Sequence, residues 1–141
     1  MEEWSFQLRV QLNEKAAKMI RESLENKELE TLKDILTNHN ACLKCQYDAF
    51  EEYVMEAEEY GIDKYPLYKW TKATIENLKK KEKYLRSFTI YIDNQHVYPK
   101  DQADALEKDL LSISSKEYIQ KIFKHDTNPA NNPQVPEQFR N

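Results

Sequence analysis

Glycine is nearly absent from this chain of 141 residues, in which Gly61 is the single example. Average usage of about 7% would give roughly ten glycines. A glycine-rich phosphate loop, a dinucleotide-binding fingerprint and a Gly-x-Ser-x-Gly nucleophile elbow each need several glycines at fixed spacing. The chain cannot build any of these three motifs, so the enzyme classes that depend on them are excluded.

Cysteines and long apolar runs are also scarce. The two cysteines lie three positions apart, which is not a disulfide framework and predicts reduced thiols in the cytoplasm. No run of eighteen apolar residues occurs, so we expect no membrane span and no membrane partner. The N-terminal residues Met-Glu-Glu-Trp lack the basic start and apolar stretch of a signal peptide.

Charge is abundant and unevenly spread along a chain whose net charge is −4. Residues 1–62 hold 14 acidic and 7 basic side chains, whereas residues 63–100 hold 4 acidic and 9 basic ones. Such asymmetry indicates a contact surface in the middle of the chain. The negative total provides no general attraction to nucleic acid.

The hydrophobic pattern predicts a predominantly helical α+β domain over residues 1–125, followed by an irregular tail rich in proline and asparagine over residues 126–141. Apolar and polar residues alternate from Trp4 to Leu12, which is typical of a half-buried strand. Asn13 and Asn26 then precede two short amphipathic segments, so we expect each asparagine to cap a short helix.

Two long helices, over residues 41–60 and 66–86, are predicted to form an antiparallel hairpin. Gly61 stands where the first helix should end in a left-handed conformation. Pro66 suits the first turn of the second helix, because its missing N–H has no partner there in any case.

A β-hairpin is expected over residues 87–98, around the turn pair Asp93-Asn94, because Phe88, Ile90 and Ile92 alternate with polar positions. The sheet should therefore be small and antiparallel. Two C-terminal helices should follow. Asp101 caps the first, and the capping box from Ser114 to Glu117 starts the second.

The spacing His39-x-x-Cys42-x-x-Cys45 is the motif with the most chemical content. Imidazole and thiolates are good Zn²⁺ ligands, and a Cys-x-x-Cys pair at a helix start can also act as a redox dithiol. Against both readings, the two cysteines continue an apolar helical stripe with Ala49 and Tyr53. That continuation favours buried structural thiols. Zinc is the only cofactor that the sequence suggests, and only as an alternative.

The predicted helix 66–86 carries a basic face. This face could bind nucleic acid or an acidic partner, although a solvated lysine face is the commoner meaning of such a pattern. The acidic face of helix 41–60 should also point outward, so we expect the two charged faces not to pair with each other. The basic residues are Lys69, Lys72, Lys79, Lys80, Lys83 and Arg86.

No complete catalytic constellation can be assembled from local spacing, so we do not expect an enzyme. Low glycine with many Lys, Asn, Tyr and Ile resembles bacterial or phage accessory proteins. The favoured hypothesis is a small, non-catalytic interaction or regulatory protein that binds a protein partner or a second copy of itself. Nucleic-acid binding through the basic face, and a metal or thiol site at His39, Cys42 and Cys45, are the alternatives.

Overall fold

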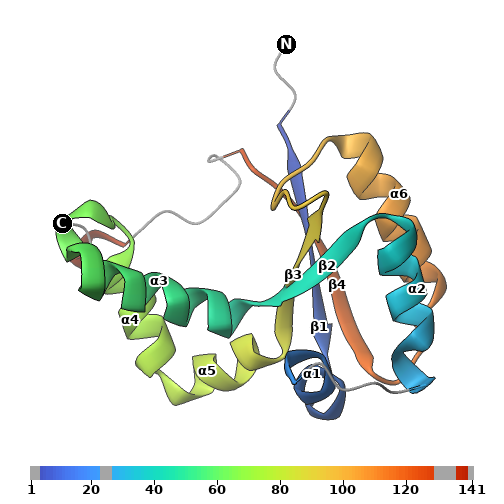
Figure 1. Cartoon of the computed structure of the whole chain (residues 1–141), viewed down its shortest axis with the longest axis horizontal. Helices are drawn as coiled ribbons and strands as arrows, with labels where there is room; N and C mark the ends of the chain where they lie inside the picture. Colours follow the sequence, from blue (N-terminus) through green and yellow to red (C-terminus); the bar gives the residue numbers. More distant parts are fainter. Residues whose placement is uncertain (1–3, 23–26, 129–135, 140–141) are drawn as a thin grey trace.

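The computed structural model describes residues 4–22, 27–128 and 136–139, over which the chain forms an α+β fold with a four-stranded antiparallel sheet (Figure 1). The strands are β1 (Phe6–Leu12), β2 (Ala41–Cys45), β3 (Ser87–Ile92) and β4 (Ile119–Asp126). The helices are α1 (Glu14–Arg21), α2 (Glu30–Asn38), α3 (Gln46–Tyr60), α4 (Tyr68–Glu76), α5 (Leu78–Leu85) and α6 (Lys100–Ser112). Single 3-10 turns are η1 (Lys27–Leu29), η2 (Ile62–Lys64) and η4 (Glu137–Phe139).

The strands lie in the order β2-β3-β1-β4, and every neighbouring pair is antiparallel. It follows that β1 runs parallel to β2 with β3 between them, and that β3 runs parallel to β4 with β1 between them. Helices α1 and α2 connect the first of these pairs, and α6 connects the second. This is the split β-α-β arrangement, with α3, α4 and α5 inserted between β2 and β3.

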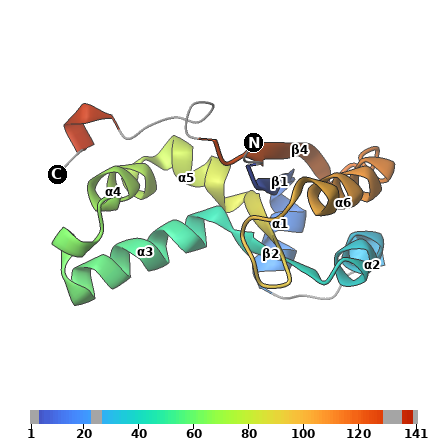
Figure 2. The same cartoon turned by 90° about the horizontal axis from the view of Figure 1, so that it is seen from above.

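The hydrophobic core lies on one face of the sheet, under α1, α2 and α6. Leu8 and Val10 of β1 pair with Ile90 and Phe88 of β3, and all four side chains are buried. Figure 2 shows α2 and α6 on one side of the sheet, and α3, α4 and α5 on the other. The predicted N-terminal strand is confirmed, as is Asn13 as the cap of α1, since its side chain accepts a hydrogen bond from the Ala16 N–H at 2.8 Å.

Helices α3, α4 and α5 form an arm, residues 46–85, that extends away from the sheet (Figure 1). The core cluster of buried residues includes none between 46 and 87, all of which are described. The predicted helical hairpin is confirmed, and so is the role of Gly61, which ends α3 at φ 113°.

The second helix of this hairpin is not continuous, contrary to the prediction. It is divided at Asn77, whose side chain accepts a hydrogen bond from the Lys80 N–H at 3.1 Å and so begins α5 as a separate helix. Asparagine favours such a cap over a position inside a helix, because its side chain competes for backbone N–H groups. Pro66 lies two residues before the start of α4 and not in its first turn.

The prediction of a helix over residues 41–60 is wrong for residues 41–45, which form β2. Asn40 has φ 51° and turns the chain after α2, so that Ala41 to Cys45 pair with β3. Cross-strand pairing along the edge of β3 outweighs the helical spacing of the apolar residues here. Helix α3 begins only at Gln46.

The last predicted helix is also wrong, because residues 119–126 form β4 beside β1. The return strand of the expected β-hairpin is reduced to two isolated bridges, Gln95 to Ile92 and Tyr98 to Phe6. The turn at Asp93 and Asn94 is confirmed, since both residues have positive φ. Helix α6 begins at Lys100 with Pro99 at the cap position, so Asp101 lies in the first turn and is not the predicted cap. The predicted cap Asn26 and most of the predicted tail lie outside the described residues.

Candidate functional site

The residues of the predicted metal or thiol site are not gathered into one site. Side chains three apart on a strand point to opposite faces, and accordingly Cys42 is exposed whereas Cys45 is buried in the core. Burial raises the pKa of the Cys45 thiol, which favours the neutral form. The described residues contain no group of three side chains placed to hold a metal ion.

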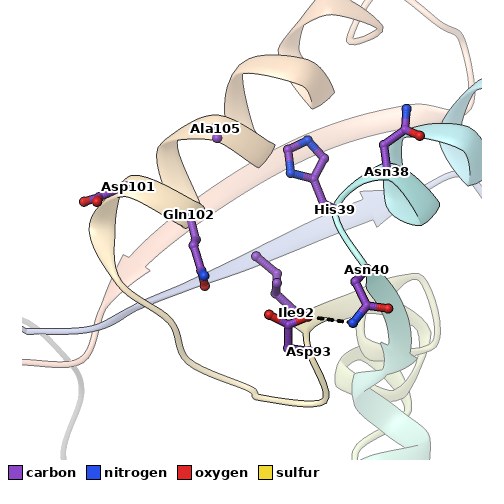
Figure 3. A pocket seen from close by; sticks show the side chains of 8 residues that line it. All are labelled: Asn38, His39, Asn40, Ile92, Asp93, Asp101, Gln102 and Ala105. Carbon is purple, nitrogen blue, oxygen red and sulfur yellow. Dashed lines mark hydrogen bonds between the residues drawn. The ribbon is translucent and has the colours of Figure 1, made fainter.

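His39 instead forms a pair with α6, with 2.6 Å between its Nε2 and Oδ2 of Asp109. It borders a polar pocket of about 390 Å³ (Figure 3). At the other side of this pocket, the Asn40 amide donates a hydrogen bond to Asp93 at 2.6 Å. None of the lining residues is a serine, threonine, cysteine, lysine or tyrosine, so beside His39 the pocket offers the carboxylates of Asp93 and Asp101 but no hydroxyl, thiol or amine nucleophile. Its lining residues are Asn38, His39, Asn40, Ile92, Asp93, Asp101, Gln102 and Ala105.

The predicted basic face is divided between two helices by the break at Asn77. The expectation that the acidic and basic helices would not pair is wrong at Lys72, whose ammonium donates to Glu58 at 3.2 Å and to the Tyr68 hydroxyl at 3.1 Å. These two contacts, Tyr68 first, raise the pKa of Lys72. Arg86 donates to Gln120 at 3.3 Å.

Three lysines of that face, Lys69, Lys79 and Lys80, are exposed and have no ion-pair partner within the described part of the chain. Lys83 lies at the base of the arm, where it helps to line a cleft beside the sheet. Of the six predicted basic residues, Lys72 and Arg86 thus have polar side-chain partners, Glu58 and Gln120.

The arm carries most of the exposed large hydrophobic side chains. Five of the seven in the described residues lie between residues 55 and 78, and the other two are Trp4 and Leu111. Leu78 is 78% exposed and Met55 is 62% exposed. These side chains lie along α3, in the turn after it, and at the starts of α4 and α5. The five are Met55, Tyr60, Ile62, Leu67 and Leu78.

The outer side of α3 is acidic around Met55. Glu51, Glu52, Glu56 and Glu59 are all exposed. Glu52 accepts a hydrogen bond from Lys44 at 2.7 Å, and Glu56 accepts one from the Tyr65 hydroxyl at 3.0 Å. The other two carboxylates have no cationic partner in the part of the chain that the structure describes. The arm thus presents free acidic groups on α3 and free basic groups on α4 and α5.

A second cleft, of about 120 Å³, separates the base of the arm from the sheet. Of its lining residues, the sequence singles out only Lys83, as part of the basic face. Arg9 is a polar position of the alternating N-terminal strand. Phe123 and His125 belong to β4, a segment for which the sequence predicts a helix. The lining residues are Arg9, Val10, Gln46, Lys83, Tyr84, Ser87, Phe123 and His125.

Comparison with protein-family models, with curated proteins and with solved structures finds no match to this chain. None of the helices in the described residues is long and apolar enough to cross a lipid bilayer.

Proposed function

We propose that this chain is a small, non-catalytic interaction protein that binds a second copy of itself through the arm. The observation that carries the proposal is the placement of exposed apolar side chains on an element that the core does not need. Helices α4 and α5 bury none of their residues. Leu78, at the start of α5, and Met55, on α3, present their side chains to solvent. Burying such side chains against a partner would contribute about 25 cal/mol for each Å² of apolar surface.

Charge on the arm supports a second copy as the occupant. A two-fold interface uses the same surface on both subunits, so that surface must be complementary to itself. The arm meets this requirement, because Glu51 and Glu59 on α3 and Lys79 and Lys80 on α5 are opposite charges without partners among the described residues. Such charges contribute orientation and association rate more than affinity.

The two cysteines are free thiols, which supports a cytoplasmic location.

Sedimentation velocity on the full chain tests the proposal. Between about 1 µM and 500 µM, a range that spans moderate to weak affinities, the chain should pass from monomer to dimer. Raising salt from about 50 mM to 500 mM should weaken the dimer, because the charged part of the contact is screened. Met55→Glu should raise the dissociation constant at least about tenfold, since it places a carboxylate in an apolar contact.

Leu111→Glu is the matched control, because Leu111 is 54% exposed on α6 and outside the arm. It should leave the dissociation constant within about twofold of the unmodified chain. A chain that stays monomeric over the whole concentration range, or that is weakened equally by both substitutions, would contradict the proposal.

A further inference from the structure

The strands carry cations and aromatic rings on the face of the sheet opposite the core, where Lys44 is paired with Glu52 of α3 at 2.7 Å. Register and alternation place Lys44, Thr89, Arg9 and Phe123 in one row across the four strands. Next to this row, Cys42 pairs with Tyr91 at one edge of the sheet, and Gln7 pairs with His125 at the other. Beside them lie Gln11 and Lys121. We call these ten residues the open face. None of them is an aspartate or a glutamate, although the whole chain is acidic with a net charge of −4.

Arg9, on a central strand, is the cation at the middle of this face. Its Nε donates to Oε1 of Gln7 at 2.7 Å, and no carboxylate in the described residues pairs with it. Burial lowers the pKa of the guanidinium, and the nearby Arg9 charge contributes, after burial, to lowering the pKa of His125. A partly buried guanidinium is normally paired, because desolvation of an unpaired charge is costly. Among the described residues, no carboxylate therefore compensates the positive charge of Arg9.

The cleft at the base of the arm concentrates this charge. Arg9, Lys83 and His125 all line it, together with the Ser87 and Gln46 side chains and no acid. Its volume of about 120 Å³ is well above the roughly 10–15 Å³ that a cavity needs to hold one water molecule. A compact oxyanion such as a phosphate group fits this space, whereas the rest of a larger ligand would lie outside it along the strands.

Aromatic rings border the cleft along the open face. Phe123 stacks on His125, with ring centroids 5.8 Å apart and 24° between the planes. Tyr91 lies on the same side of β3 as Thr89, the residue that pairs with Arg9. Phe123 is directly opposite Arg9, where Cβ atoms are about 5 Å apart, and the diagonal neighbours Tyr91 and His125 are about 7–8 Å from Arg9. Alternating cations and aromatic rings on an open sheet can bind both the phosphates and the bases of an unpaired nucleic-acid strand.

We propose that the open face binds single-stranded nucleic acid, with one phosphate in the cleft against Arg9 and Lys83 and bases stacked on the rings of β3 and β4. This site is separate from the predicted basic helix face and shares only Lys83 with it. It does not depend on self-association through the arm. A free phosphate or an acidic peptide would offer part of the same chemistry, and the experiment distinguishes them.

Fluorescence anisotropy with labelled 12-nucleotide RNA and DNA, in about 50 mM salt, tests the proposal. Single strands should bind at least about tenfold more tightly than the corresponding duplex, because paired bases cannot stack on the rings. With Arg9 and Lys83 engaged, log K should fall with log salt at a slope of roughly −1.4, at about 0.7 for each phosphate contact. Inorganic phosphate and a glutamate 12-mer should compete poorly.

Two substitutions separate charge from stacking. Arg9→Gln should weaken binding about tenfold and reduce the salt slope by about 0.7, since one phosphate contact is lost. Tyr91→Leu should weaken binding about tenfold and leave the slope unchanged, since it replaces a stacking ring by an uncharged aliphatic side chain. Urea unfolding of each variant, with a midpoint close to that of the unmodified chain, shows that the fold is retained.

Paired controls locate the site. The double variant Lys79→Gln, Lys80→Gln removes two exposed cations of the arm, and Lys108→Gln removes one from α6. Both should bind single strands within about twofold of the unmodified chain. The proposal would be overturned if the Lys79, Lys80 double variant lost binding, or if single strands and duplex bound equally well. Equal competition by the glutamate 12-mer, or no binding in about 50 mM salt, would also overturn it.

Discussion

At the scale of single residues, Tyr98 shows how one buried hydroxyl holds two strands together. It is 2% exposed, and its hydroxyl accepts a hydrogen bond from the Leu8 N–H at 2.7 Å and donates one to the Ile90 carbonyl at 2.9 Å. Tyr98→Phe leaves both backbone groups without this partner. The free energy of unfolding should fall by about 1–3 kcal/mol, measured by urea unfolding at neutral pH.

The same residue predicts a loss of stability at high pH. Burial raises the pKa of Tyr98 to about 12, above its ordinary value of 10.0. Between these two values the folded chain keeps a proton that the unfolded chain loses, so the contribution is complete below about pH 10 and is lost as the pH rises toward 12. The loss should be on the order of 2 kcal/mol. Tyr98→Phe should unfold with a weaker pH dependence over this interval, and an unchanged dependence would contradict the assignment.

Gly61 is a second single residue that matters for stability, through its backbone conformation. Its φ of 113° is one that side chains rarely adopt, although an added Cβ would meet no atom within 4 Å. Gly61→Val should therefore cost about 1–3 kcal/mol through backbone strain alone. Urea unfolding measures this cost. Ala73→Val, at an exposed position of α4, is the control and should cost no more than about 0.7 kcal/mol. Equal losses would show that the conformation of Gly61 is not strained for valine.

At the scale of secondary-structure elements, the sequence predicts those whose signal is local. The alternation from Trp4 to Leu12 identifies β1, and Gly61 locates the end of α3. The break at Asn77 was detectable in principle, because asparagine is a better cap than a helix-interior residue. It was missed because Leu67, Trp70 and Thr74 run on into Leu78 at helical spacing.

Strands β2 and β4 could not be predicted in this way, because distant partners determine them. In β4, Ile119, Ile122 and Phe123 have helical spacing, and Lys124 occupies a position on the core side of the sheet. The structure accounts for that lysine, since its ammonium pairs with Asp104 and Glu107 of α6 at 2.8 and 3.0 Å. The open face depends on both strands. A local pattern therefore could not reveal it.

The arm as an element should be dispensable for folding. Because Cys45 and Phe88 are paired across β2 and β3, a two-residue Asn-Gly turn can replace residues 46–87, which are the arm together with Arg86 and Ser87, the first residue of β3. The shortened chain should unfold cooperatively, within about 2 kcal/mol of the full chain, since the core is kept and the shorter loop costs less entropy to close. Circular dichroism during urea unfolding measures this. A chain without cooperative unfolding would show that the arm completes the core.

At the scale of the whole molecule, the fold separates two kinds of surface. A split β-α-β body buries the core under α1, α2 and α6, while the arm and the open face lie on the other side of the sheet. Stability belongs to the body, and the proposed interactions belong to the other side. Substitutions on the arm and on the open face should therefore change binding much more than they change unfolding.

Charge exchange between two variants of the full chain tests the central proposal most directly. One variant carries Glu51→Lys and Glu59→Lys, and the other carries Lys79→Glu and Lys80→Glu. Sedimentation velocity should find each variant weakened at least about tenfold as a homodimer, because like charges then meet across the two-fold axis. An equimolar mixture should recover a dimer close to the original affinity. The paired control Lys108→Glu, Lys116→Glu, outside the arm, should have no such effect. Two variants that stay monomeric when mixed, or that dimerise alone as well as the unmodified chain, would contradict self-association through the arm.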